Sequence, residues 1–233
     1  MIDLDGTLMH TAPEIAQAVN RMLADMSKPA LDEKQVEAYI GEGVTTLIKR
    51  CLTQRLDAQG LDTQHLDIQH PDIQHPGGEP DAAVFAKAQK LFFEYYAKIV
   101  SESKPYPGVV AGLQALRSAG YRLACVTNKQ ERFTLPLLEA SNLLQYFELV
   151  VSGDTLQKKK PEPDQIFYIC EKFGVSVQEA VLIGDSNIDI TAARSAGCYV
   201  FAVPYGYNQG RSIGAKSVDA LINNMSDVLD LIH

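Results

Sequence analysis

The sequence predicts an α/β fold in which a doubly wound parallel sheet is interrupted by an inserted helical domain. Short apolar runs alternate with helical patterns in the C-terminal half of the chain, and the long stretch before them is helical throughout. Two prolines, Pro105 and Pro107, mark the boundary between these parts. Alternation of strands and helices is typical of a parallel sheet that is covered by helices on both faces.

The predicted strands are four short apolar runs in the C-terminal half. Each run is a few residues long, rich in β-forming residues and bounded by polar residues or glycine, as expected for buried parallel strands. The runs cover residues 122–127, 149–152, 180–184 and 199–203.

The segments between these strands have helical periodicity, which completes a Rossmann-like pattern. Three of the four end at a glycine, where a left-handed C-terminal cap is expected: Gly120, Gly174 and Gly197. The predicted helices cover residues 109–119, 132–141, 164–173 and 188–196.

The first part of the chain predicts helices alone. They cover residues 13–26, 32–39, 44–56 and 81–100. We therefore expect two domains: an α/β core formed by residues 1–11 and 104–233, and a helical domain formed by residues 12–103.

A low-complexity insertion of about residues 59–80 lies inside the helical part. Three tandem pentapeptides, LDTQH, LDIQH and PDIQH, place His65, His70 and His75 five residues apart. This spacing does not align side chains on one face of a helix, which requires three or four residues. We therefore expect an exposed, partly disordered insertion rather than a metal site.

Composition excludes several classes of function. The chain has 233 residues and a formal net charge of −8, which argues against nucleic-acid binding. No apolar run approaches the roughly 20 residues of a membrane helix, and no signal peptide is visible. The four cysteines form no CxxC pair and predict buried, reduced thiols. We expect a cytoplasmic monomer or homodimer that acts on a small molecule, without membrane or nucleic-acid partners.

Two carboxylates stand at the start of the chain, in the run Asp3-Leu4-Asp5-Gly6-Thr7. At a strand end, side chains two residues apart point the same way, and Gly6 allows the chain to turn sharply after them. One carboxylate could attack phosphorus while the other moves a proton to the leaving oxygen. Taken alone, the same run could form an ordinary turn.

Polar groups follow the next two predicted strands. Thr127-Asn128-Lys129 offers a hydroxyl and an amide to phosphate oxygens, although such a run also caps helices. Lys160, before Pro161, could neutralise a phosphate as a point charge. Its neighbours Lys158 and Lys159 are expected to be solvated.

Two more carboxylates follow the strand at 180–184. Asp185 stands at the strand end and Asp189 four residues later, so both can face one point at the start of a helix. This pair suits Mg²⁺, which takes one or two protein carboxylates together with waters and a substrate phosphate. A simple helix N-cap is the alternative.

Together, these motifs resemble those of the haloacid dehalogenase-like hydrolase superfamily. Its four motifs occur in order over essentially the whole chain, and the helical insertion matches the type 1 cap of that superfamily. The resemblance implies that Asp3 is the nucleophile and Asp5 the general acid/base. The second aspartate favours phosphate chemistry, because the dehalogenases of the superfamily lack it.

The resemblance also implies the binding residues. Thr127, Asn128 and Lys160 would bind the transferring phosphoryl group. Mg²⁺ would be held by Asp3, by the backbone carbonyl of Asp5 and by Asp185, with Asp189 supporting that site.

Two further stretches are similar to the phosphoglycolate phosphatase branch: Gly41-Glu42-Gly43 with Leu47 and Arg50, and residues 203–208. The resemblance implies that Gly41, Glu42 and Gly43 form a cap loop that reads the substrate. Arg50 could bind a substrate carboxylate. It could equally form a surface ion pair on a cap helix.

The expected activity is magnesium-dependent hydrolysis of a small phosphate monoester through an aspartyl-phosphate, with 2-phosphoglycolate as the preferred substrate. A sugar-phosphate phosphatase or phosphomutase, and a catalytically silent binding protein, are the alternatives.

Only Met1 and Ile2 precede Asp3. Either the true start lies upstream or the first strand is a stub, which would leave neighbouring strands without ladder partners.

Overall fold

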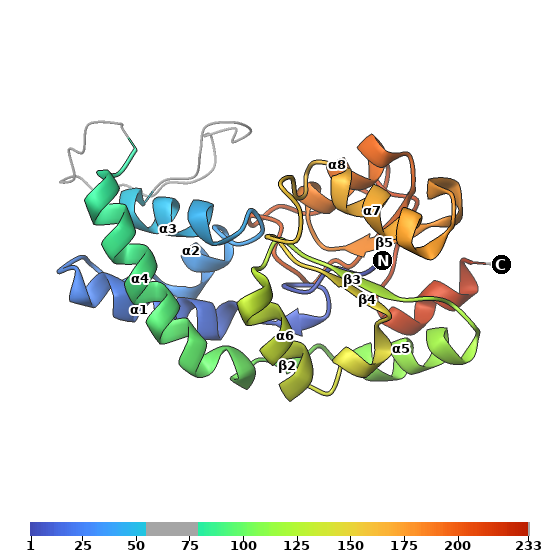
Figure 1. Cartoon of the computed structure of the whole chain (residues 1–233), viewed down its shortest axis with the longest axis horizontal. Helices are drawn as coiled ribbons and strands as arrows, with labels where there is room; N and C mark the ends of the chain where they lie inside the picture. The colour runs from blue at the N-terminus through green and yellow to red at the C-terminus, as the bar shows by residue number, and fades with distance from the viewer. Residues whose placement is uncertain (55–78, 233) are drawn as a thin grey trace.

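The computed structural model describes residues 1–54 and 79–232 (Figure 1). The tandem pentapeptides and the three histidines that they contain lie outside the described residues. Within the described ranges, helices α1–α4 gather at one end of the molecule and the parallel sheet lies at the other (Figure 1).

The parallel sheet confirms the predicted α/β class. Strands β3 and β4 pair in parallel, as do β5, β6 and β7. Four of these strands lie within the predicted runs, and β7 was not predicted. The strands are β3 (Ala124–Val126), β4 (Leu149–Val151), β5 (Val181–Gly184), β6 (Tyr199–Ala202) and β7 (Ala220–Leu221).

Ile2 joins the two groups of strands into one sheet. It bridges Cys125 of β3 on one side and Ile183 of β5 on the other, both in parallel. The Ile2 N–H donates to the Ala124 carbonyl and the Asp3 N–H to the Ile183 carbonyl, each at 2.9 Å. The first segment is therefore short but has ladder partners on both sides, and Asp3 leaves the sheet at the carboxyl ends of β3 and β5.

Alternate strand residues face two different hydrophobic clusters, as a doubly wound sheet requires. Ala124 and Leu182 pack in one cluster with α7 (Asp164–Phe173) and α8 (Asn187–Ala196). On the other face, the large cluster includes the strand residues Ile2, Cys125 and Ile183. Its helical partners there are α5 (Val109–Ser118), α6 (Glu131–Ala140) and η4 (Met225–Asp230).

The helical segment confirms the four helices predicted before residue 104, each within a few residues of its expected ends. The helices are α1 (Ala12–Asp25), α2 (Glu33–Glu37), α3 (Val44–Thr53) and α4 (Ala82–Ile99). Val19, Ile48 and Phe92 belong to the same buried cluster as Ile2, so the apolar core continues from the sheet into these helices.

Short elements were missing from the prediction. An antiparallel ribbon of β1 (Met9–His10) and β2 (Lys104–Pro105) forms where the chain leaves and re-enters the α/β part. Two-residue strands are too short to show an alternating pattern. The other short elements are the 3₁₀ turns η1 (Val100–Glu102), η2 (Leu144–Tyr146) and η3 (Val177–Glu179).

Two predictions from composition can be compared with the fold. The four cysteines Cys51, Cys125, Cys170 and Cys198 are buried and unbonded, as expected. Of the helices in residues 1–54 and 79–232, none combines the length and apolarity that a membrane crossing requires.

The central position of Ile2 predicts a large cost for its truncation. Ile2 is 1% exposed, and removing a buried Ile side chain to Ala costs about 2–5 kcal/mol. We expect Ile2→Ala to lower the free energy of unfolding in urea by about that amount. Val110→Ala, at a site that is 43% exposed, is the control and should change it by less than about 0.5 kcal/mol. Equal effects of the two variants would contradict the central role of Ile2.

Candidate active site

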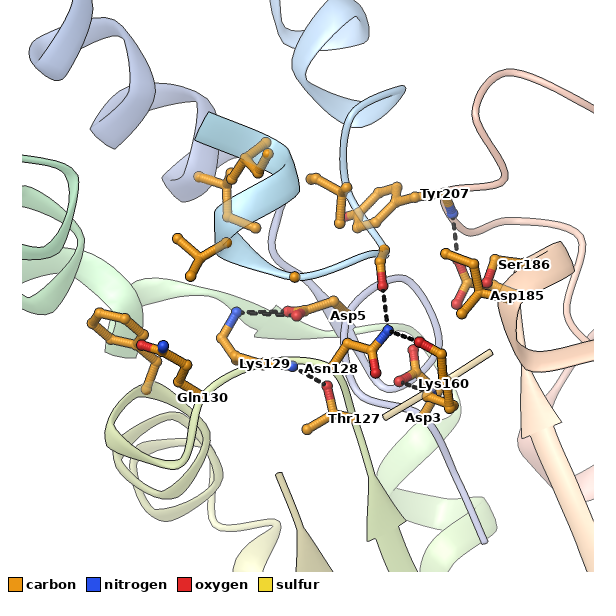
Figure 2. A pocket seen from close by; sticks show the side chains of 18 of the residues that line it. Asp3, Asp5, Thr127, Asn128, Lys129, Gln130, Lys160, Asp185, Ser186 and Tyr207 are labelled. Carbon is orange, nitrogen blue, oxygen red and sulfur yellow. Dashed lines mark hydrogen bonds and ion pairs between the residues drawn. The ribbon is translucent and has the colours of Figure 1, made fainter. Parts of the chain in front are cut away.

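Polar side chains from four strand ends meet around a cavity of about 60 Å³ at the carboxyl edge of the sheet (Figure 2). The structure thus brings together the side chains that the sequence motifs singled out. The predicted residues that line the cavity are Asp3, Asp5, Gly41, Gly43, Thr127, Asn128, Lys160, Asp185 and Asp189.

Lys160 is the buried centre of this group. Its Nζ lies 2.6 Å from an oxygen of Asp3, 2.6 Å from an oxygen of Asp189 and 3.0 Å from the Val126 carbonyl. The residue is 3% exposed. Burial alone would lower the pKa of this ammonium group, but the two carboxylates outweigh that effect and raise it. Lys160 therefore carries a fixed positive charge beside Asp3.

Asp3 is buried, and its neighbours act on the pKa of its carboxyl in opposite directions. Burial raises the pKa of its carboxyl to about 7, whereas the Lys160 ammonium acts in the opposite direction. Burial also raises the pKa of Asp185, reinforced by the charges of Asp3 and Asp189. A cation bound between these carboxylates would favour their ionised forms.

Asp185 is held by hydrogen bonds to both of its oxygens. The Thr7 hydroxyl donates to one at 2.7 Å and the Tyr207 N–H to the other at 2.5 Å. Gly6 permits this arrangement, because a Cβ atom there would lie 2.3 Å from Asp185 Oδ2 and the residue has φ +89°. The turn predicted at Gly6 is confirmed.

Asp189 links the site to the start of α8. Its Oδ2 accepts hydrogen bonds from the hydroxyl of Ser186 at 2.6 Å and from the Ser186 N–H at 3.2 Å. Its Oδ1 binds Lys160. Asp189 is thus both a residue of the helix N-terminus, where Ser186 is the N-cap, and a partner of the buried lysine. Its support of a metal ion stays a prediction.

The donor set suits a small divalent cation. Asp3, Asp185 and Asp189 offer ligand oxygens that lie within 4.8 Å of one another, and all three residues are buried. Among the described residues that line the cavity, these three and Asp5 carry negative charge, against the two ammonium groups of Lys129 and Lys160. One dication would offset the formal excess of two negative charges, and carboxylate oxygens are the ligands that Mg²⁺ prefers.

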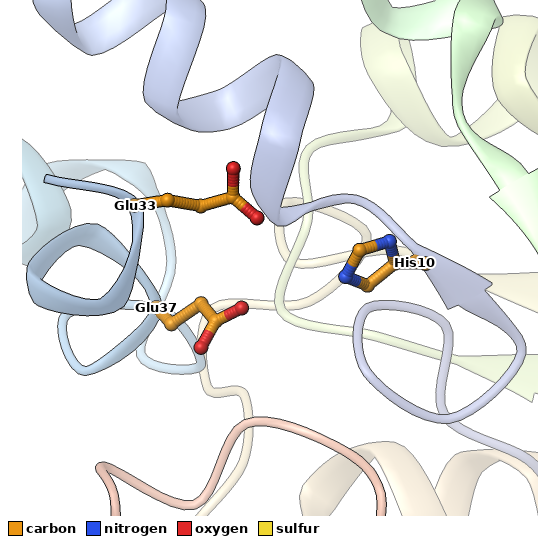
Figure 3. Close-up of side chains that lie close together, drawn as sticks. All are labelled: His10, Glu33 and Glu37. Carbon is orange, nitrogen blue, oxygen red and sulfur yellow. The ribbon is translucent and has the colours of Figure 1, made fainter.

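A second group of potential ligands lies elsewhere in the described part of the chain. His10 of β1 faces Glu33 and Glu37 of α2 (Figure 3), with ligand atoms within 4.8 Å of one another. Glu33 is exposed, and the other two residues are partly exposed. This group does not line the cavity described above.

Asp5 is bound by a residue to which the sequence assigned no role. Lys129 Nζ lies 2.8 Å from Asp5 Oδ1 and 3.1 Å from Oδ2 (Figure 2). The lysine is 8% exposed, and its Nζ lies 4.8 Å from the centroid of the Tyr96 ring. Its position two residues after Thr127, at the same strand end, was the signal that could have identified it.

The residues predicted to bind phosphate after β3 differ in their contacts. Thr127 Oγ1 accepts a hydrogen bond from the Lys129 N–H at 3.1 Å, which leaves its hydroxyl hydrogen able to donate into the cavity. Asn128 Nδ2 instead donates to the Gly41 carbonyl at 2.9 Å and to the Lys160 carbonyl at 2.8 Å. The Asn128 side chain thus ties the loop at residues 41–43 to the α/β part.

Lys159 makes a second contact with that loop. Its Nζ donates to the Glu42 carbonyl at 2.8 Å, and burial lowers the pKa of this partly buried ammonium group. The prediction that Lys159 is solvated was therefore wrong, because the loop covers it. Lys158 is exposed, as predicted.

Arg50 lies inside the helical segment. It is 4% exposed and forms an ion pair of 2.5 Å with Glu42. It is absent from the described residues that line the cavity. The ion-pair interpretation of Arg50 thus fits the structure, although the pair is partly buried rather than on the surface, and a contact with substrate stays a prediction.

Comparisons with known proteins agree with this geometry. Residues 1–203 match the family model described as haloacid dehalogenase-like hydrolase. The chain belongs to the haloacid dehalogenase-like hydrolase family. The resemblance seen in the four motifs is thereby confirmed.

Individual relatives of the haloacid dehalogenase-like hydrolase are similar over almost their whole length. Phosphoglycolate phosphatase of Nitrosospira multiformis is 45% identical over 234 residues, covering 100% of this chain and 94% of the relative. The enzyme of the same name from Thiobacillus denitrificans is 45% identical, covering 97% and 92%. A crystal structure described as a predicted phosphoglycolate phosphatase from Haemophilus somnus has a TM-score of 0.85 at 33% identity and covers 99% and 95%. The chain is accordingly an enzyme, a phosphoric monoester hydrolase.

The raised pKa of Asp3 predicts a pH-dependent effect of its neutralisation. A carboxyl with a pKa of about 7 in the folded state and about 3.9 in the unfolded chain contributes stability at low pH, and this contribution is lost as the pH rises through 7. Asp3→Asn should therefore stabilise the metal-free protein at pH 8, and the gain should shrink as the pH falls towards 4. Urea unfolding at both pH values, with EDTA present, measures this. A gain that grows towards acid pH would contradict the assignment.

Proposed function

We propose that this hydrolase is a magnesium-dependent phosphatase that forms an aspartyl-phosphate on Asp3, and that its substrate is 2-phosphoglycolate. The observation that carries the proposal is the buried carboxylate of Asp3, held 2.6 Å from Lys160 Nζ with Asp5 two residues away. The relatives named phosphoglycolate phosphatase, at up to 45% identity, support the substrate.

Attack on phosphorus is the task of Asp3. Its ion pair with Lys160 fixes one oxygen, so the carboxylate cannot turn away from the cavity. The Lys160 charge also offsets the repulsion between a carboxylate and a phosphate dianion. The Thr127 hydroxyl can donate to a phosphoryl oxygen. Asp3, the Asp5 carbonyl and Asp185, with support from Asp189, would hold Mg²⁺, which would supply Lewis-acid stabilisation of charge on the phosphoryl oxygens.

Proton transfer is the task of Asp5. In the first half of the reaction it gives a proton to the leaving alkoxide. In the second half it takes a proton from the water that attacks the phosphorus of the aspartyl-phosphate. Its place in the lining of the cavity, two residues after Asp3, supports this role.

The helical domain, residues 12–103, is proposed to act as a cap on the α/β core of residues 1–11 and 104–233. Gly41 and Gly43 line the cavity, so the loop that contains them contributes a wall to it. In this role Gly41, Glu42 and Gly43 limit the size of the substrate.

A sugar-phosphate phosphatase or phosphomutase would use the same core residues. The small cavity, about 60 Å³, favours a smaller ester than a hexose phosphate. The choice between a small ester and a sugar phosphate therefore depends on the walls of the cavity, which include the loop at 41–43, rather than on Asp3 and Asp5.

Replacement of the nucleophile gives the most direct genetic test. Asp3→Asn should reduce turnover by at least about 10⁴-fold, because an amide cannot form the acyl-phosphate. Phosphate release in the presence of Mg²⁺ measures this. Asp230→Asn, at an exposed position, is the matched control and should retain wild-type turnover. Near-normal activity of folded Asp3→Asn would end the assignment.

Substrate choice can be tested with a panel at fixed Mg²⁺. We expect kcat/KM for 2-phosphoglycolate to exceed that for glucose 6-phosphate and for AMP by at least about 10²-fold, because a buried cavity discriminates strongly against misfitting polar groups. A phosphomutase would instead interconvert sugar phosphates with little release of phosphate. Equal rates across the panel would contradict the proposed substrate.

A further inference from the structure

Lys129 is the second buried ammonium group of the cavity, and its bonds differ from those of Lys160. Lys160 is shared by two carboxylates and a carbonyl. Lys129 Nζ has one carboxylate partner, Asp5, whose two oxygens it contacts at 2.8 and 3.1 Å. Its other neighbour is the face of the Tyr96 ring, 4.8 Å away, which attracts a cation without fixing a direction. Because Lys129 has a single carboxylate partner, it can exchange Asp5 for another carboxylate.

The contact with Lys129 conflicts with the work proposed for Asp5. To protonate a leaving oxygen, Asp5 needs one oxygen that carries a hydrogen and points at the substrate. An ammonium group that donates to both oxygens occupies the positions that this hydrogen would need. Lys129 must therefore find another acceptor before the first chemical step.

A substrate with a carboxylate beside the leaving oxygen supplies such an acceptor. In 2-phosphoglycolate, one CH₂ group separates the ester oxygen from the carboxylate carbon. Asp5 acts on this ester oxygen, so a cation that contacts Asp5 is within reach of the substrate carboxylate. Among the described residues that line the cavity, Lys129 and Lys160 are the two with positive charge, and Lys160 is engaged at Asp3.

The surroundings of Lys129 favour an anion at this place. Tyr96 is 2% exposed, and its hydroxyl interacts with the Lys129 ammonium group but donates no hydrogen bond within the described part of the chain. Phe92 and Phe133 line the same cavity, and apolar walls strengthen an ion pair between a lysine and a bound carboxylate. A buried hydroxyl whose hydrogen has no acceptor, beside a buried cation, is the composition expected of a carboxylate receptor.

We infer that Lys129, assisted by the Tyr96 hydroxyl, binds the carboxylate of the substrate, and that this exchange releases Asp5 to act as the acid. The inference rests on the proposed function and deepens it. It assigns recognition of the substrate carboxylate to Lys129 of the α/β part together with Tyr96 of α4, whereas the sequence had suggested Arg50 for this role. A phosphate ester without the adjacent anion leaves Lys129 on Asp5 and reacts slowly.

The test compares two esters that differ in this one group, 2-phosphoglycolate and 2-hydroxyethyl phosphate. Lys129→Met keeps the length of the side chain and removes its charge. We expect kcat/KM for 2-phosphoglycolate to fall by about 10²-fold or more, as for loss of a buried charge partner. For 2-hydroxyethyl phosphate we expect kcat/KM to rise, because the variant removes the ammonium group that occupies both oxygens of Asp5. Lys158→Met, at an exposed position, should leave both values unchanged.

Further variants keep the inference falsifiable if Lys129→Met does not fold. Lys129→Arg should retain part of the preference for 2-phosphoglycolate, and Tyr96→Phe should lower kcat/KM for this ester alone, by about 5- to 10-fold for one hydrogen bond. An equal loss on both esters would overturn the inference and leave Lys129 as a residue that only positions Asp5. Failure of the wild-type protein to hydrolyse either ester would instead count against the proposed function itself.

Discussion

The site depends on one buried ammonium group, that of Lys160, which lies between Asp3 and Asp189 at 2.6 Å from each. A charge buried to this degree is tolerated only when it is paired and hydrogen-bonded. The pairing ties together three segments far apart in the sequence: the first turn, the loop after β4 and the start of α8. Loss of Lys160 would leave two buried carboxylates facing each other, so the same contact that orients Asp3 also holds the sheet edge together.

The remaining contacts extend this arrangement towards the helical segment. Ile2 places Asp3 between β3 and β5, and Thr7 orients Asp185 from the same turn. Asn128 and Lys159 then attach the loop at 41–43 to the α/β part through two backbone carbonyls. Both contacts are to carbonyl oxygens, so they fix the backbone of the loop, while the side chain of Glu42 is held separately by Arg50.

The sequence predicted most of the fold because its strands and helices are regular enough to show their periods, and because strand ends converge in a parallel sheet. It missed β1 and β2, whose two-residue strands carry no period. Lys129 and Lys159 were missed because a lysine after a strand is ordinarily solvated, and their burial arises from distant partners, Asp5 and Glu42. The burial of Arg50 likewise follows from how α3 packs, which the local sequence does not encode.

Chemical trapping of the intermediate tests the central claim most directly. The protein is mixed with [³²P]-labelled 2-phosphoglycolate and Mg²⁺, quenched in acid within milliseconds and digested for peptide mapping. The account predicts label on the peptide that contains Asp3, stable in acid and released by hydroxylamine, as expected of an acyl-phosphate. Turnover without label on any residue, or label on a different side chain, would contradict it.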